Sequence, residues 1–337
     1  MSSPSGSGSA LPATAPGPRT RTTSSPTPAD AQATLPGVLL DSNAYRGLSD
    51  AQFDTILEAE TRHGVARYCE PFVVAEFLTH LADPADKGYA SCRRAVVRTY
   101  RRCNVGAGGE CGILRDPESR IAEFITGKKL ERHDWYTEHV IAPLLGDAAL
   151  VPAGQPLLAQ MEPHLRAIAE HMAKVEAGFA ETGRQVKATV ATTLAGEKGE
   201  QRKETLRRAQ RLHESPATRW GFAQTFIRQA YANAGMTLPD PLPDALVLGV
   251  RHGCAAAIEF EAIIWEKIVF QDAKPESPHI LNLRWDQRIA YYIGWSMRGR
   301  PLWLVTDDND FARAAAAAGL GDRVHTLAAY ERWLGGT

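Results

Sequence analysis

Short apolar runs near the two ends of the chain predict buried strands, and a long amphipathic stretch between them predicts helices. Residues 37–40 and 302–305 are continuous apolar runs of the length and composition of buried β-strands. Residues 65–69 and 323–327 predict two further strands. Acidic and polar residues directly follow the strands predicted at 37–40 and 302–305. Open α/β sheets bind their ligands at the carboxyl ends of strands, so we expect the functional residues there.

The remaining apolar positions recur at helical spacing. Ser49 is a typical N-cap and Gly64 a typical end for a helix over residues 50–63, and Pro71 suits the first turn of the next helix. Further helices are predicted near residues 88–103, 116–125, 133–145, 156–182, 216–227, 244–269, 285–297, 312–318 and 328–334. Residues 112–275 are almost wholly helical in this interpretation.

These patterns predict four parts in the chain. Residues 1–36 are rich in Ser, Pro and Thr and are expected to be a disordered tail. Residues 37–104 and 276–337 are expected to be the two parts of one α/β domain, and residues 105–275 a helical insertion. The glycine-rich segment 104–110 is interpreted as a junction, because its spacing does not fit a dinucleotide-binding fingerprint.

Composition narrows the partners and the compartment. The net charge of −1 over 337 residues excludes a chain that coats nucleic acid through charge alone. Five cysteines, an odd number at irregular spacing, favour a reducing cytoplasm over a disulfide framework. Cys103 and Cys111 have no second pair at zinc-site spacing, so a structural zinc is not predicted. No run is long enough to span a membrane, so no membrane partner is expected.

Acidic residues follow two of the predicted strands and lie on two of the predicted helices. Asp41 follows the first strand, and Asp308 and Asp310 follow the strand over 302–305. Glu76 lies on the helix that starts at Pro71, and Asp286 stands at the head of a later helix. Taken alone, the stretch after residue 305 has an alternative interpretation, in which Asp308 or Asn309 only caps the helix that follows. Together these carboxylates are the hard oxygen ligands that Mg²⁺ and Mn²⁺ prefer.

A second feature is a basic stripe on the helix over residues 88–103. Four of its arginines fall at helical spacing: Arg94, Arg98, Arg101 and Arg102. Such a stripe is either a nucleic-acid-binding face or an ordinary solvated face, and the sequence leaves both open. Residues 184–213 are also rich in Lys and Arg and form a second segment of this kind.

The acidic motifs together resemble the PIN-domain nucleases, a family that includes the VapC-type toxins of bacterial toxin–antitoxin pairs. Val38-Leu39-Leu40-Asp41-Ser42-Asn43 is similar to the family's opening strand, and Val74-Ala75-Glu76-Phe77-Leu78 supplies the second acid. Asp286-x-x-Ile289-Ala290 resembles the third acid at the head of a helix. Leu304-Val305-Thr306-x-Asp308-x-Asp310-Phe311 resembles the last motif, and the order of the four along the chain is the family's order.

The resemblance implies a fold, an activity and a site. The expected fold is α/β, a three-layer α/β/α sandwich with a central parallel sheet, interrupted here by a large all-α insertion. The expected activity is hydrolysis of RNA by an endoribonuclease that uses Mg²⁺ or Mn²⁺ to activate water. By resemblance, the catalytic and metal-binding acids are Asp41, Glu76, Asp286 and Asp308, with Asp310 as an additional metal ligand and Asn43 and Thr306 as supports.

Alternatives remain beside this hypothesis. A catalytically inactive module on the same fold could bind RNA or a protein through the helical insertion. A phosphatase of the haloacid-dehalogenase type needs a second Asp two residues after the first, and Asn43 occupies that position. Within the nuclease hypothesis two roles stay open: a toxin with an antitoxin partner, and a phage-defence effector. The sequence also leaves open a regulatory protein partner and a homodimer.

Overall fold

The computed structural model describes residues 35–103, 111–152, 155–157 and 159–336, and these form one compact unit. Most of the expected tail and the whole glycine-rich junction at 104–110 lie outside the described residues. None of the helices in the described ranges has the length and apolarity needed to cross a membrane.

A six-stranded sheet joins the two ends of the described chain. Its strands are β1 (Gly37–Leu40), β2 (Ala66–Cys69), β3 (Cys111–Ile113), β4 (Ser296–Met297), β5 (Arg300–Val305) and β6 (Val324–His325). The order is β3-β2-β1-β5-β4, and β6 also pairs with β5. β1 pairs in parallel with β2 and β5, and Leu40 lies opposite Val305. The carboxyl ends of β1 and β5, 265 residues apart in sequence, therefore meet at one edge of the sheet.

Helices make up most of the structure. Those that precede residue 155 are α1 (Ser42–Gly47), α2 (Asp50–His63), α3 (Pro71–His80), α4 (Tyr89–Cys103), α5 (Pro117–Thr126), α6 (Glu131–Tyr136), the π-helix η2 (Thr137–Ile141) and α7 (Ala142–Leu150). Those that follow are the 3₁₀ turn η3 (Ala159–Met161), α8 (Glu162–Leu194), α9 (Gly199–His213), α10 (Pro216–Asn233), α11 (Asp244–Gly253), α12 (Ala255–Val269), α13 (Pro278–Ala290), α14 (Asn309–Ala317), the 3₁₀ turn η4 (Gly321–Arg323) and α15 (Leu327–Gly336).

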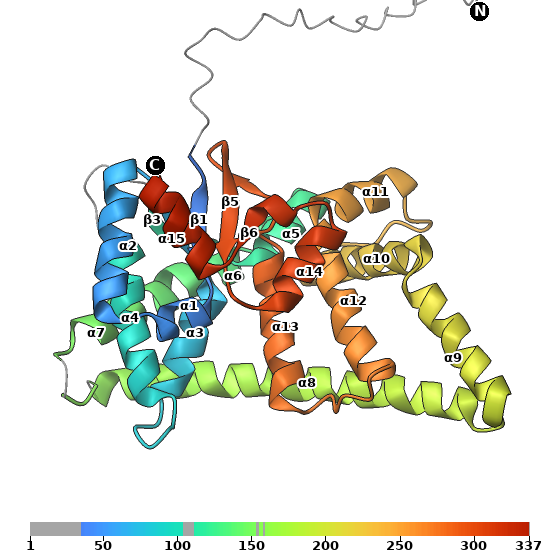
Figure 1. Cartoon of the computed structure of the whole chain (residues 1–337). Helices are drawn as coiled ribbons and strands as arrows, with labels where there is room; N and C mark the ends of the chain where they lie inside the picture. The colour runs from blue at the N-terminus through green and yellow to red at the C-terminus, as the bar shows by residue number, and fades with distance from the viewer. Residues whose placement is uncertain (1–34, 104–110, 153–154, 158, 337) are drawn as a thin grey trace, which may run out of the picture. The chain divides into compact units, whose positions relative to one another are not determined.

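The expected three-layer α/β/α sandwich is wrong. The structure is about 70% helical, and its small sheet is curled and mixed, because β4 runs antiparallel to β5. The longest strand has six residues and the others have four or fewer. A sheet this small offers little apolar area, and most of the buried apolar side chains lie on helices. Figure 1 shows the 33-residue helix α8 extending along one side of the unit, where α3, α12 and α13 pack against it.

Several helix boundaries differ from the sequence-based prediction for local reasons. The single helix expected over 244–269 is two helices, because Cys254 leaves helical geometry between α11 and α12. The neighbouring Gly253 faces Phe124, whose ring would lie 2.9 Å from any added Cβ. The helix expected over 285–297 begins earlier and ends at Ala290, since Gly294 adopts a φ of 93° and the chain enters β4. The short strand β3, in a region expected to be helical, was not predicted.

One buried ion pair ties the helices to the sheet. The Arg102 and Glu60 side chains are fully buried, with Arg102 Nη2 2.7 Å from Glu60 Oε1. The guanidinium also donates to the backbone oxygens of Val38 in β1 and Tyr68 in β2, each at 3.1 Å. The Tyr330 hydroxyl in α15 donates to the same Glu60 oxygen at 2.7 Å. This network connects α2, α4 and α15 to the central strands, and with both charges paired it satisfies groups that would be costly to bury alone.

Candidate functional site

Asp41 stands at the carboxyl end of β1 and is held there by two hydrogen bonds. Its carboxylate caps α1 by accepting the backbone N–H of Ala44 at 2.7 Å. The other carboxylate oxygen accepts the hydroxyl hydrogen of Thr306, which follows β5. An apolar strand that ends on Asp-Ser-Asn places the acid at the N-cap position, so the local sequence explains its placement. Asp41 is only 3% exposed.

Asp308 and Asp310 follow β5 at the same edge. Asp308 caps α14 by accepting the backbone N–H of Asp310 at 2.6 Å, and its own N–H donates to Thr306 Oγ1 at 3.0 Å. Thr306 therefore connects the loop after β5 to Asp41. The carboxylate of Asp310 pairs with Lys267 of α12 at 3.1 Å. The capping interpretation of Asp308 is correct, and it is compatible with a place in an acidic site.

Glu76 and Asp286 approach this edge from two helices. Glu76 lies on α3 and pairs with Arg46 of α1 at 2.9 Å. Asp286 lies on α13, which packs against α3. Burial raises the pKa of Asp286 well above its usual range, and the negative charges of Asp308, Glu76, Asp41 and Asp310 raise it further. The structure thus brings all five acids expected from the sequence into one electrostatic cluster, which we call the strand-end acid cluster.

The same crowding acts on Asp41. Its burial raises the pKa from 3.8 to about 6, while the hydrogen bonds from Thr306 and from the Ala44 backbone act in the opposite direction. The charges of Asp308 and Glu76 add smaller upward contributions. The ionised form of the cluster is therefore unfavourable with protein groups alone.

The strand-end acid cluster fits a hard divalent cation by its chemistry. Its donor atoms are all carboxylate oxygens, the ligands that Mg²⁺ and Mn²⁺ prefer. Arg46 and Lys267 contact two of the five acids and cannot neutralise the whole set. No three of these five described side chains bring ligand oxygens within 4.8 Å of one another. A cation shared among them would therefore draw the carboxylates inward from the positions set by Thr306, Arg46 and Lys267.

The two expected supporting residues have different surroundings. Thr306 is buried and bonds to Asp41 while accepting the N–H of Asp308, which is what a residue that positions both acids would do. Asn43 is exposed, and its side-chain oxygen accepts a hydrogen bond from Arg46 at 3.1 Å. Since Arg46 also pairs with Glu76, Asn43 acts on the cluster through that arginine.

The basic stripe on α4 is divided between the core and the surface. Arg102 is fully buried in the pair with Glu60, and Arg98 is 4% exposed and donates to the Tyr45 backbone oxygen. These two guanidiniums are not available to nucleic acid. Arg94 is exposed, and Arg101 is exposed in a surface pair with Asp54. Helical spacing alone does not distinguish buried arginines from exposed ones. On an amphipathic helix, arginines lie along the border between the buried and the exposed face, and the side chain can turn to either side.

A second group of polar residues, not predicted from the sequence, lies near the ends of β2 and β3. The group consists of Asp116 and Glu118 at the start of α5 and His133 of α6. Each offers one possible ligand atom, and the three atoms lie within 4.8 Å of one another. Glu70 follows β2 directly, is fully buried, and has its pKa raised to about 8, mainly by burial and also by the charge of Asp116. The position of Glu70 after a strand, like that of Asp41, is the signal that could have identified it. We call Asp116, Glu118 and His133 the α5–α6 cluster.

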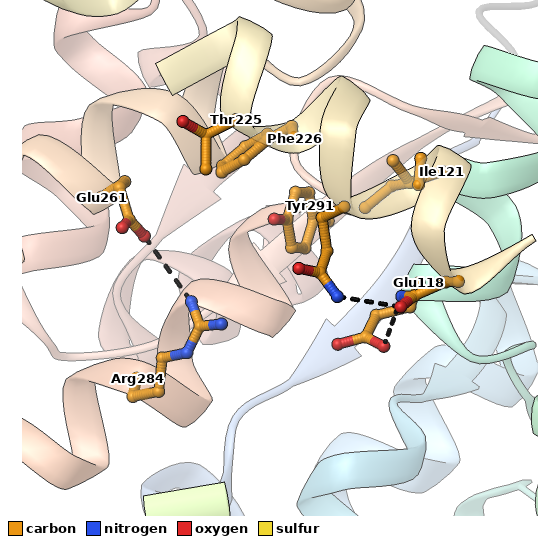
Figure 2. Close-up of a pocket in the computed structure, with 10 residues that line it drawn as sticks. Glu118, Ile121, Thr225, Phe226, Glu261, Arg284 and Tyr291 are labelled. Carbon is orange, nitrogen blue, oxygen red and sulfur yellow. Dashed lines mark hydrogen bonds and ion pairs between the residues drawn. The ribbon is translucent and has the colours of Figure 1, made fainter. Parts of the chain in front are cut away.

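A cavity of about 110 Å³ opens beside this second cluster. Figure 2 shows Glu118 at one end and the pair of Glu261 and Arg284 at the other, with Tyr291 between them. The Glu261 and Arg284 side chains are 3.6 Å apart, and Glu118 accepts a long hydrogen bond of 3.4 Å from Asn233.

Comparison of the chain with family models, curated proteins and solved structures gives no match.

Proposed function

We propose that this chain is a divalent-metal-dependent nuclease that hydrolyses phosphodiester bonds in RNA. The observation that carries the proposal is the grouping of Asp286 with four other carboxylates, which come from the ends of β1 and β5 and from α3 and α14 and whose charges act on it. A cluster of this kind costs stability, and a divalent cation is the ligand that offsets the cost. The resemblance of its four motifs to the PIN-domain nucleases supports RNA as the substrate.

The residues that would hold the metal are Asp41, Glu76, Asp286 and Asp308, with Asp310 beside them. A bound Mg²⁺ or Mn²⁺ supplies an activated water and stabilises negative charge at the scissile phosphate. The protein's own contribution is to fix the carboxylates before substrate arrives. The capping hydrogen bonds of Asp41 and Asp308 and the hydroxyl of Thr306 hold two of them in place. Lys267 holds Asp310 and keeps a positive charge at the edge of the cluster.

The cysteines favour this proposal over a thiol nucleophile. All four cysteines whose side chains are described are buried: Cys69, Cys92, Cys103 and Cys254. Burial raises the pKa of Cys69 well above its usual range and that of Cys254 to about 12. These two thiols stay protonated near neutral pH and react poorly, since the thiolate is the nucleophile. The hydrogen bond with Cys69 lowers the pKa of Cys103, but the Cys103 side chain is buried and so is not accessible to a substrate.

The test uses purified full-length protein, a single-stranded RNA and a single-stranded DNA of the same sequence, each with Mg²⁺, with Mn²⁺ and with EDTA. We expect metal-dependent cleavage of the RNA, reduced about 100-fold or more in Asp41→Asn and Asp286→Asn, which is a usual loss when one electrostatic stabiliser of a transition state is removed. Asp307→Asn is the matched control, because Asp307 is exposed in the same loop and, within the described part of the chain, its side-chain oxygen accepts the Leu327 N–H alone.

Two results would count against the proposal. Equal cleavage by wild type and by both cluster variants would place the activity elsewhere or in a contaminant. Tight RNA binding without cleavage under either metal would instead support a binding module that lacks catalysis.

A further inference from the structure

The three residues of the α5–α6 cluster have the separations of ligands around one metal ion. His133 Nδ1 is 3.3 Å from Asp116 Oδ1 and 3.9 Å from Glu118 Oε2. Ligands on a tetrahedral zinc ion, with bonds of about 2.0–2.2 Å, lie about 3.4 Å apart. A direct charge-assisted hydrogen bond is shorter, at about 2.7–2.9 Å. The 3.3 Å separation is that of a long hydrogen bond between His133 and Asp116, and both separations are also compatible with a cation between the three side chains.

The surrounding residues orient two of these side chains. Both oxygens that face His133 already accept one hydrogen bond, Asp116 Oδ1 from the Ser119 N–H and Glu118 Oε2 from Asn233, and each keeps a second lone pair for a cation. Arg288 Nη2 lies 2.6 Å from Glu118 Oε1, so Oε2 is the oxygen that faces His133. Asp116 caps α5 by accepting the backbone N–H of Ser119 at 3.0 Å. Partners of this kind orient metal ligands in known sites. Arg288 is itself buried, and its guanidinium lies 4.5 Å from the Phe72 ring centre.

Glu70 gives an independent sign that a ligand belongs here. Its side chain is fully buried, and Oε2 accepts the Val73 N–H at 2.9 Å. Its other oxygen, Oε1, has no hydrogen-bond partner among the described residues. The charges of Asp116 and Arg288, two residues of the cluster and its surroundings, act on this carboxyl. A buried oxygen without a partner is costly, and a bound cation removes that cost.

We propose that Asp116, Glu118 and His133, with Glu70 as an adjacent fourth acid, bind one divalent transition-metal ion of the zinc type. An imidazole among carboxylates favours Zn²⁺ and similar ions over Mg²⁺. The charges also balance, because three carboxylates are offset by one divalent ion and Arg288. This site is separate from the strand-end acid cluster and does not depend on the proposed nuclease activity.

The ion would add a link between segments that hydrogen bonds such as Leu130 N–H to Ser119 Oγ already connect. Its ligands come from the start of α5 and from α6, and Glu70 comes from the junction of β2 and α3. The site can be reached from solvent, since the His133 side chain is 36% exposed and that of Glu118 is 24% exposed. The cavity in Figure 2 also has Glu118 in its wall.

The test measures zinc binding to the full-length chain after treatment with a chelator. Zn²⁺ is titrated against a chromophoric chelator, and Co²⁺ is added separately to record the visible absorption of a coordinated ion. Variants are His133→Ala and the nearly isosteric Glu118→Gln, and the matched control is His139→Ala, which removes an exposed imidazole one helical turn and a half further on. Asp286→Asn is included to separate this site from the strand-end acid cluster. Circular dichroism verifies the fold of each variant.

We expect one tight zinc equivalent in wild type, in His139→Ala and in Asp286→Asn. In His133→Ala and Glu118→Gln we expect the affinity for Zn²⁺ to fall by more than about 100-fold, which is the upper end of the loss seen for outer-shell changes. The visible absorption of bound Co²⁺ should be lost in both variants. Absence of tight binding to wild type would overturn the proposal. Binding by folded His133→Ala and Glu118→Gln as tight as wild type would overturn it too, since Asp116 and His133 would then form only an ion pair.

Discussion

Neutralising Asp41 should stabilise the metal-free protein, although Asp41 belongs to the site that we expect to do the chemistry. Burial raises the folded-state pKa of this carboxyl from 3.8 to about 6. Below pH 3.8 both the folded and unfolded forms carry the proton, and Asp41 then has no effect. As the pH rises, the unfolded chain ionises first, so the free energy of unfolding falls until the folded form also ionises near pH 6.

The size of the effect follows from the shift. A shift of about two units, at about 1.4 kcal/mol each, costs the wild type about 3 kcal/mol at pH 8 and about 1 kcal/mol at pH 4.5. Asn has the same shape, cannot ionise, and keeps an oxygen that accepts the Ala44 N–H. Asp41→Asn should therefore exceed the wild type by about 1 kcal/mol at pH 4.5 and by about 3 kcal/mol at pH 8.

Urea denaturation in EDTA at the two pH values measures this difference. The control Asp307→Asn changes an exposed acid and should stay within about 0.5 kcal/mol of wild type at both. Added Mn²⁺ at about 1,000 times its dissociation constant should then reverse the order, because it stabilises the wild type by about 4.1 kcal/mol, which exceeds the gap of about 3 kcal/mol, and stabilises the variant much less. An Asp41→Asn variant that is no more stable than wild type at pH 8, or a gap that does not grow with pH, would refute the electrostatic account of this site.

Two further predictions concern the core. Arg102→Met should lower the free energy of unfolding by about 3–5 kcal/mol, because its carboxylate partner is left buried and unpaired. Arg101→Met breaks a surface pair on the same helix and should lower it by less than about 1 kcal/mol. Urea denaturation measures both, and equal losses would contradict the buried network. Gly183→Ala places a Cβ 2.5 Å from Pro275 and should cost about 1–3 kcal/mol, while Gly178→Ala in the same helix meets open space and should gain about 0.5–1 kcal/mol. Thermal or urea unfolding of the two glycine variants should show shifts of opposite sign.

The sequence was most informative where local signals and chemistry coincide. The apolar runs at 37–40 and 302–305 correspond to β1 and to most of β5, and the acids that follow them meet because the two strands pair in parallel. Ser49 and Gly64 bound α2 as expected, since caps are set by neighbouring residues. Strand ends and caps are local properties, so one sequence suffices to locate them.

The fold class and the second cluster depend on information that local patterns do not hold. The three residues of β3 are too few for a periodic signal, and the balance between sheet and helix layers depends on how distant segments pack. Local patterns place Arg98 and Arg102 in a stripe with the exposed arginines, because their buried partners lie more than 40 residues away in the sequence. Asp116 is recognisable as a helix cap from its sequence, but its proximity to His133 is set by the turn between α5 and α6.

The most direct measurement of the central claim is the rate of RNA cleavage by the full-length protein with Mn²⁺, compared between Asp286→Asn and Asp307→Asn. If the strand-end acid cluster is a metal-dependent catalytic site, Asp307→Asn should cleave at the wild-type rate and Asp286→Asn about 100-fold more slowly or not at all. Equal rates for the two variants, or cleavage that persists unchanged in EDTA, would contradict it.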